Sequence, residues 1–191
     1  MLSREFLTER GYCCGHGCLM CPYEPKHIKD NTLLKVLNCF KEDNQLIQKK
    51  LRSVSVDEGE IIAGKLFQVL NKRRDGIGLA ANQVGIDAAV AVVNVKEPIV
   101  LINPKIVSKE EKVRYHEGCL SFPKKGVNTE RYKIVEIETD NYESNLTFGA
   151  GDTDLDLLES VCVQHEIDHL NGVVCMDRKS IQPIELKRAW S

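Results

Sequence analysis

Residues 164–172 of this 191-residue chain read Gln-His-Glu-Ile-Asp-His-Leu-Asn-Gly. They belong to a longer helical pattern that Gly172 can end. Two histidines four residues apart, His165 and His169, lie on one face of a helix, where their rings can hold one divalent metal ion. Glu166 can take a proton from water at an open coordination position and later return it. The stretch therefore predicts a catalytic metal site carried by a helix.

A site of this kind needs a third protein ligand. Cys175 stands at the spacing of the long zinc-endopeptidase signature HExxHxxGxxH, in the place of its third histidine. Cys119, in the segment Glu-Gly-Cys-Leu-Ser (117–121), would reach the helix from a distant strand or loop. Thiolate ligation is chemically acceptable for either residue, and local spacing favours Cys175. The short pattern alone also fits two ordinary histidines at a charged helix end.

The flanking sequence predicts mixed secondary structure. Helical spacing of apolar residues covers 57–74, and part of 32–52 also reads as helical. Short apolar or alternating runs predict strands at 88–95, 98–104, 112–117 and 131–140. The late helix covers 154–171. This order of elements indicates an α+β fold, with antiparallel or mixed sheets around a central metal-binding helix.

The composition excludes several classes of protein. With 26 basic and 28 acidic residues the net charge is −2, which argues against a strongly basic DNA-binding protein. A hydrophobic content of 42% is enough to bury a core. Residues 1–10 have no signal-peptide pattern, and no run is long enough to cross a membrane. We therefore expect a cytoplasmic protein that does not bind a membrane.

Three separated motifs decide between the two candidate ligands. They are Gly-Ile-Gly-Leu-Ala-Ala-Asn-Gln at 76–83, Glu-Gly-Cys-Leu-Ser at 117–121, and the helix stretch at 164–172. Their order, spacing and residue types closely resemble peptide deformylase, whose motifs read GxGLAAxQ, EGCLS and QHExDHLxG. The resemblance covers about residues 50–180.

The resemblance implies a reaction and a metal. Cys119, His165 and His169 would bind one divalent ion, ferrous iron in the cell, with zinc or nickel as replacements, and water would fill the fourth position. Glu166 would act as general base and then general acid. The substrate would be the formyl group on the N-terminal methionine of a nascent polypeptide, which would be released as formate. A zinc endopeptidase that uses Cys175 and a non-catalytic metal-binding module are the alternatives.

The resemblance also implies roles for other residues. The side-chain amide of Gln83 and the backbone N–H of Leu120 would stabilise the oxyanion that forms during attack. The stretch around Ile77 and Gly78 would pair with the substrate backbone as an added strand. Two further residues are expected to line the substrate site, Gly118 and Arg131. Arg131 could instead position Glu117 or lie in solvent.

A cysteine-rich segment precedes this pattern. Residues 1–30 are expected to form a knuckle or arm, and 31–191 the catalytic domain. The segment resembles a small module of the form GYCCGxGCxxCPY, and its candidate ligands for a second zinc ion or an iron–sulfur cluster are Cys13, Cys14, Cys18 and Cys21. A redox pair and free thiols are the alternatives. We expect Cys39, Cys162 and Cys175 to be buried thiols, and the protein to be a monomer, with docking to the ribosome left open.

Overall fold

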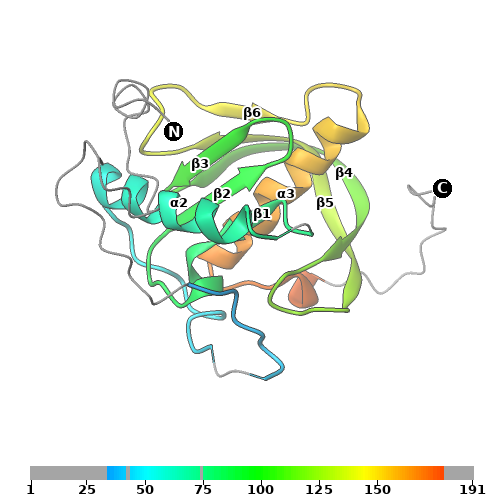
Figure 1. The fold of residues 1–191 in the computed structure, drawn as a ribbon. Coiled ribbons are helices and arrows are strands. Elements are labelled where there is room, and N and C mark those ends of the chain that lie inside the picture. The colour runs from blue at the N-terminus through cyan, green and yellow to red at the C-terminus, as the bar shows by residue number, and fades with distance from the viewer. Residues whose placement is uncertain (1–33, 42–43, 74, 179–191) are drawn as a thin grey trace, which may run out of the picture. The chain divides into compact units, whose positions relative to one another are not determined.

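Two three-stranded antiparallel sheets and two α-helices build the fold in the computed structural model, which describes residues 34–41, 44–73 and 75–178 (Figure 1). The elements are α2 (Val56–Leu70), β1 (Gly78–Ala80), the 3₁₀ helix η1 (Ala81–Val84), β2 (Val90–Asn94), β3 (Pro98–Ile102), β4 (Lys105–Gly118), β5 (Gly126–Glu138), β6 (Leu146–Phe148), α3 (Asp154–Leu170) and the 3₁₀ helix η2 (Cys175–Arg178). The α+β fold predicted from the sequence is confirmed.

The sheets have the strand orders β1-β2-β3 and β4-β5-β6. In the first sheet, β1 lies at an edge and pairs with β2 from Gly78↔Val93 to Ala80↔Ala91. In the second, β4 and β5 form a long hairpin whose last pair is Gly118↔Gly126. The turn that closes this hairpin begins with Cys119, so the second sequence motif lies at the tip of a two-stranded ribbon.

Helix α3 has well-defined ends. The side chain of Thr153 accepts a hydrogen bond from the backbone N–H of Asp156, whose carboxylate accepts one from the Thr153 N–H, which is a reciprocal cap. At the other end the backbone of Gly172 has a φ of +73°, and a Cβ there would lie 2.7 Å from the carbonyl of Gln48. Only glycine fits this position, so the predicted helix stop is confirmed.

Helix α3 packs against both sheets and forms the centre of the fold (Figure 1). Every residue from Glu159 to Leu170 is buried. The core around it consists of Leu51, Ala80, Ala91, Val93, Leu101, Val135, Ile137, Phe148, Cys162, Val163, Ile167 and Leu170. The first turn of the helix is less covered, and Leu155 there is 53% exposed. From Glu159 onward the helix is buried all round because a sheet lies on each side of it.

The helix expected within 32–52 is not formed in its described part, where the chain makes turns and irregular structure. The backbone N–H of Leu37 donates to the carbonyl of Gln83 at 2.8 Å, and that of Cys39 donates to Ser121 at 2.9 Å. These tertiary hydrogen bonds replace the local bonds that a helix would need. Cys39 is half-buried rather than part of the core.

Strands β4 and β5 are longer than predicted. The middle of β4, Ser-Lys-Glu-Glu-Lys at 108–112, is exposed or half-buried and therefore lacks an apolar alternation that would mark a strand.

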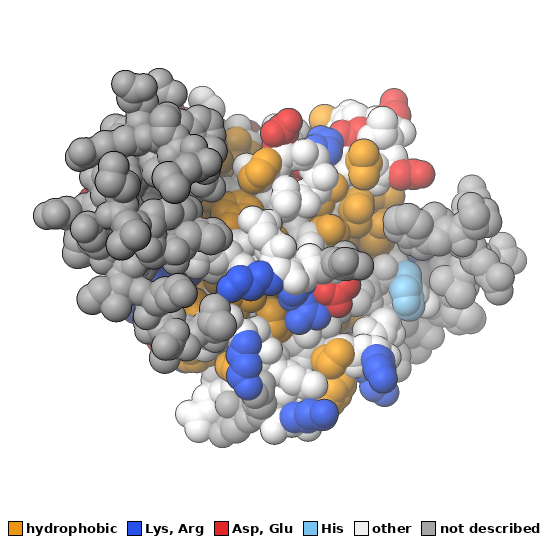
Figure 2. Space-filling view, viewed as in Figure 1, with side chains coloured by type: hydrophobic (Ala, Val, Ile, Leu, Met, Phe, Trp, Pro, Cys, Tyr) orange, Lys and Arg blue, Asp and Glu red, His pale blue; other side chains and the backbone are white. Residues whose placement is uncertain are grey.

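On the face shown in Figure 2, acidic side chains gather near the start of α3, and Lys and Arg side chains gather on the lower half. Among the described helices, none has the length and apolar character needed to cross a membrane.

The cysteine-rich segment at 1–30 lies outside the described residues, and with it the predicted second metal site and the boundary between the two predicted domains.

Candidate metal centre

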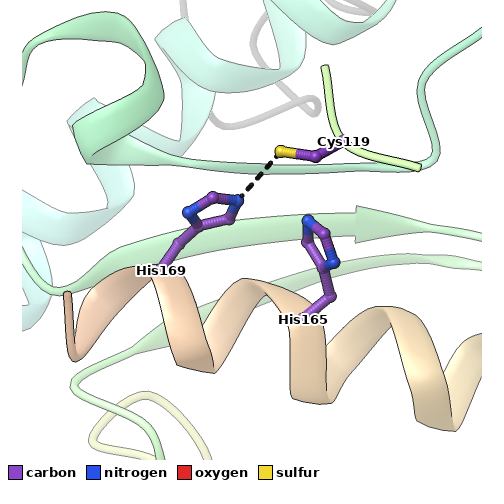
Figure 3. A group of neighbouring side chains, drawn as sticks. All are labelled: Cys119, His165 and His169. Atoms are coloured by element: carbon purple, nitrogen blue, oxygen red, sulfur yellow. Dashed lines mark hydrogen bonds between the residues drawn. The ribbon is translucent and has the colours of Figure 1, made fainter. Parts of the chain in front are cut away.

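The structure brings Cys119, His165 and His169 together from two distant parts of the chain. Their ligand atoms all lie within 4.8 Å of one another, and all three residues are buried. The Sγ atom of Cys119 is 3.3 Å from Nε2 of His169. In Figure 3 both imidazoles rise from α3 toward the cysteine at the hairpin tip. One sulfur and two ring nitrogens form a donor set that suits zinc, ferrous iron or nickel.

Glu117 orients the first histidine. Its Oε2 atom lies 2.7 Å from Nδ1 of His165. Burial opposes ionisation of Glu117, but hydrogen bonds from His165 and Arg131 outweigh burial and lower the pKa of this carboxyl to about 2. The carboxylate is therefore charged at neutral pH and fixes the ring of His165 as it does in many metal sites.

Arg131 is buried inside a network of charges. Its Nη2 donates to Oε2 of Glu117 at 2.9 Å, its Nε donates to the other oxygen of Glu117, and its Nη1 donates to Asp168. Arg178 also donates to Asp168, at 2.7 and 2.6 Å. The alternative of a solvated Arg131 is wrong, and the network favours the positioning role over contact with substrate. Asp168 thus accepts hydrogen bonds from two arginines.

The motif at 76–83 is hydrogen-bonded to the backbone of His169 through Asn82, a residue to which the sequence assigned no role. The side-chain amide of Asn82 donates to the backbone carbonyl of His169 at 2.7 Å and to that of Leu46 at 3.3 Å. Burial lowers the pKa of His169 well below its usual value, so the ring is neutral, which is the form that binds metals. An asparagine inside the motif was the available signal, but its partner was not visible in the sequence.

Glu166 is buried close to His165. It is buried, and among the described residues its Oε2 atom has no hydrogen-bond partner. Burial raises its pKa to about 7; the nearby charge of His165 acts in the opposite direction, and that of Glu117 adds to the rise. A carboxyl with this pKa can both accept and return a proton near neutral pH.

Gly78 makes room for that carboxyl. A Cβ on Gly78 would lie 2.7 Å from Sγ of Cys162 and still closer to Oε1 of Glu166. We expected this stretch to pair with a substrate backbone, and the close packing against Glu166 is a separate reason for a glycine here. Cys162 is buried in the core cluster, as expected.

Gln83 lies next to the cysteine. Its Oε1 accepts from the backbone N–H of Ala80 at 2.8 Å, which directs Nε2 toward Cys119 Sγ at 3.6 Å and Ser121 Oγ at 3.4 Å. The amide thus presents N–H donors to the sulfur of Cys119 and the hydroxyl of Ser121. Leu120, whose backbone N–H was expected to act with Gln83, directly follows Cys119 and is half-buried.

Two of the residues expected to bind substrate, Ile77 and Gly118, lie at strand ends. Ile77 is 39% exposed and immediately precedes β1, which is the edge strand of its sheet. Gly118 is exposed at the end of β4. An edge strand beside the buried carboxyl of Glu166 is a geometry onto which an extended peptide can be added.

An α+β fold in which one buried helix carries two imidazoles and a carboxyl of raised pKa, opposite a cysteine, defines a metal-dependent hydrolase. The family model described as polypeptide deformylase matches residues 36–185. This chain belongs to the polypeptide deformylase family.

Individual relatives agree with this assignment. The chain is 32% identical over 161 residues to a peptide deformylase of Buchnera aphidicola, covering 82% of this chain and 90% of the relative. It is 34% identical to that of Aquifex aeolicus, covering 71% and 82%. The crystal structure of peptide deformylase from Thermotoga maritima matches with a TM-score of 0.63 and 30% identity, covering 76% and 96%. A peptide deformylase from Synechococcus elongatus in complex with actinonin matches with a TM-score of 0.65 and 34% identity, covering 77% and 79%.

Proposed function

We propose that Cys119, His165 and His169 hold the divalent cation with which this chain removes the N-formyl group from formyl-methionyl nascent polypeptides. The observation that carries the proposal is the buried group of one sulfur and two imidazoles beside Glu166. Neither an endopeptidase nor a non-catalytic module is favoured, because the three ligand atoms that lie together include Cys119 and the family match is to deformylases.

The donor set fits the cation that the family implies. A bound divalent ion supplies Lewis acidity, which polarises a carbonyl oxygen and makes a water molecule more acidic. We infer ferrous iron as the native ion, with zinc or nickel able to replace it, because thiolate and imidazole ligands accept all three. A reducing cytosol suits this centre, since a thiolate ligand and a ferrous ion are both open to oxidation.

Glu166 handles the proton in this scheme. Its carboxylate takes a proton from the attacking water, whose oxygen forms a bond to the formyl carbon. The C–N bond then breaks, Glu166 returns the proton to the departing amine, and the products are formate and a free methionyl N-terminus. A pKa of about 7 places this carboxyl where both transfers are accessible.

Two donors stabilise the oxyanion that forms during attack. The Nε2 of Gln83 is held toward the centre by its own Oε1, which accepts from Ala80, so it does not have to reorganise during the reaction. The backbone N–H of Leu120 is the second donor in this proposal. A neutral amide is suitable because it donates without competing for the cation.

The substrate backbone extends along Ile77 and Gly78 as an added strand, and Gly118 at the end of β4 is a further contact in this proposal. Main-chain hydrogen bonds supply affinity that does not depend on the residues after methionine. We infer that a monomer meets this substrate in the cytosol as the chain leaves the ribosome.

The test is release of formate from a formyl-methionyl peptide by anaerobically prepared full-length protein. Formate release and bound metal are both expected to fall by more than tenfold in Cys119→Ala and His165→Ala. His116→Ala is the matched control, because His116 is exposed on β4 and its Nδ1 lies 2.7 Å from Oδ1 of Asn128. If Cys119→Ala kept full metal and activity, the proposal would be wrong.

The N-terminal cysteines form a separate hypothesis. We propose a second zinc ion or an iron–sulfur cluster on Cys13, Cys14, Cys18 and Cys21, because Cys18 and Cys21 have the C-x-x-C spacing of metal knuckles. Replacement of both Cys18 and Cys21 by serine should lower the bound metal per chain by one ion or one cluster and leave formate release unchanged. An unchanged metal content would exclude this second site.

A further inference from the structure

A buried asparagine connects the 3₁₀ helix η1 to the last turn of α3. Asn82 lies in η1 and is fully buried. Its Nδ2 donates to the backbone carbonyl of His169 at 2.7 Å and to that of Leu46 at 3.3 Å. Both neighbours can only accept hydrogen bonds, so the NH₂ group rather than the amide oxygen must face them. One side chain therefore connects three segments that lie far apart in the sequence.

The carbonyl of His169 lies at the end of a helix, where fraying begins. Helix α3 ends at Leu170, and the last four carbonyls of a helix lack the regular partner from a following turn. The His169 carbonyl accepts from the backbone N–H of Gly172 at 3.1 Å, and Asn82 supplies a second hydrogen bond from a different element. This second bond opposes fraying of the turn that carries the His169 ring.

The two histidines of α3 are held by different means. The ring of His165 is fixed at Nδ1, which lies 2.7 Å from Oε2 of Glu117. Nδ1 of His169 has no hydrogen-bond partner among the described residues, and its Nε2 contacts Cys119 Sγ at 3.3 Å. The direction of the His169 ring consequently depends on its backbone, and so on the contacts that fix the end of α3.

Stability alone does not explain an amide at position 82. The Oδ1 atom of Asn82 is buried and has no hydrogen-bond partner in the part of the chain that the structure describes. An unpaired amide oxygen in the interior is unfavourable, and an apolar side chain of the same size would avoid this cost. The two hydrogen bonds from Nδ2 are therefore expected to serve the neighbouring site.

Asn82 immediately precedes Gln83, whose Nε2 lies 3.6 Å from Cys119 Sγ. Since η1 is only four residues long, a hydrogen bond at Asn82 also fixes the place of Gln83 relative to His169. We propose that Asn82 is a positioning residue, whose amide holds the last turn of α3 so that the His169 ring stays directed at Cys119. The inference rests on the proposed function, in which His169 binds the metal and Gln83 stabilises the oxyanion.

The first experiment measures release of Zn²⁺ from zinc-loaded full-length protein into an excess of a coloured chelator. Asn82→Ala is expected to release Zn²⁺ about tenfold or more faster than the wild type. Asn82→Leu, which fills the volume but has no donor, carries the same expectation. Asn44→Ala is the matched control, because Nδ2 of Asn44 donates to the backbone carbonyl of Asn82 at 2.9 Å. It loses an amide from the same region, keeps the bond to His169, and should release Zn²⁺ at the wild-type rate.

The second experiment measures hydrogen exchange of the metal-free full-length protein, and near-ultraviolet circular dichroism verifies that each variant is folded. The backbone N–H groups of residues 171–173 donate to carbonyls in the last turn of α3. They should exchange faster in Asn82→Ala than in the wild type and Asn44→Ala. If neither Asn82 variant folds well enough to bind zinc, this exchange measurement on the less destabilised of the two decides the question.

Wild-type Zn²⁺ release in folded Asn82→Ala, an equal acceleration in Asn44→Ala, or unchanged exchange at 171–173 would each overturn the inference. Failure of the proposed function is recognised separately, in the formate assay of the wild type. If the wild type releases no formate but Zn²⁺ release and exchange respond to Asn82, the positioning role stands and the assigned reaction is wrong. If formate is released and neither measurement responds to Asn82, only the role of Asn82 is lost.

Discussion

The Nδ1 atom of His165 and the Oε2 atom of Glu117 are 2.7 Å apart, in a buried pair. Because the pKa of Glu117 is lowered to about 2, its carboxylate can only accept a hydrogen bond at neutral pH. Nδ1 of His165 therefore donates its proton to Glu117, which leaves Nε2 as the ring nitrogen available to a cation. The acid of the second motif thus selects the tautomer of a histidine in the third.

Replacement of Glu117 by glutamine should weaken metal binding by about 10- to 100-fold, because the neutral amide holds this tautomer less strongly. Competition with a coloured chelator measures the dissociation constant. Glu130→Gln is the control, since Glu130 is exposed and pairs with Lys112 at 2.8 Å. Equal affinities for Glu117→Gln and the wild type would show that the pair does not support the ligand.

Truncation of the Arg131 side chain should destabilise the folded protein. Arg131→Ala leaves the carboxylates of Glu117 and Asp168 buried without this partner, and we expect the free energy of unfolding to fall by about 3–5 kcal/mol. Urea unfolding of the metal-free protein provides the value. Lys112→Ala, which breaks an exposed pair, should cost less than about 1 kcal/mol. Similar losses in the two variants would contradict the structural role of the buried network.

Loss of the Glu166 carboxylate should slow formate release without affecting metal binding. Glu166→Gln is expected to retain its metal and to release formate about 10²- to 10⁴-fold more slowly, because it can no longer accept a proton. Parallel metal analysis and steady-state formate release test this expectation. A variant with near-normal kcat would remove Glu166 from the proposed mechanism.

Two glycines should respond in opposite ways to the same substitution. Gly78→Ala forces a methyl group against Glu166 and Cys162, and it should lower both formate release and, by about 1–3 kcal/mol, stability. Gly64 lies in α2 with nothing within 4 Å of its missing Cβ. Gly64→Ala should therefore raise the free energy of unfolding by roughly 0.5–1 kcal/mol and leave activity unchanged. A harmless Gly78→Ala would contradict the close packing of β1 on α3.

The first turn of α3 predicts a pH dependence. Hydrogen bonds from Thr153 and Lys96 lower the pKa of Asp156 from 3.8 to about 2. A lowered pKa means that the ionised form stabilises the fold above pH 3.8 and that this contribution disappears as the pH falls toward about 2. In the metal-free protein, Asp156→Asn should have a lower melting temperature than the wild type at pH 6, and the two curves should converge near pH 2. A difference that stays constant with pH would rule out this origin.

The sequence predicted those features that are encoded locally. The helix at 154–171 and its glycine stop follow from periodicity and one backbone requirement, and α3 ends as expected. The candidate ligands follow from short motifs, and the structure brings His165, His169 and Cys119 together. Local spacing alone would have favoured Cys175, so the correct grouping came from the three motifs taken together.

What could not be predicted depends on contacts between distant residues. The partner of Asn82 is the backbone of His169, and those of Asp168 are two arginines on other elements. The irregular path of residues 34–41 is set by hydrogen bonds to Gln83 and Ser121, which compete with helix formation. None of these partners leaves a periodic signal in the sequence.

Burial of α3 on all sides has a consequence for how the metal is kept. Its amide hydrogens from Glu159 to Leu170 should exchange with solvent only when the whole domain opens, because no face of this stretch is free to fray. Both histidines that we propose as ligands are therefore expected to belong to the slowest-exchanging unit of the described domain. Cys119, in contrast, lies in the turn that closes a two-stranded ribbon. Metal exchange in the native state is thus expected to begin with opening of that turn. The two histidines would keep their positions and could bind the metal again when the turn closes.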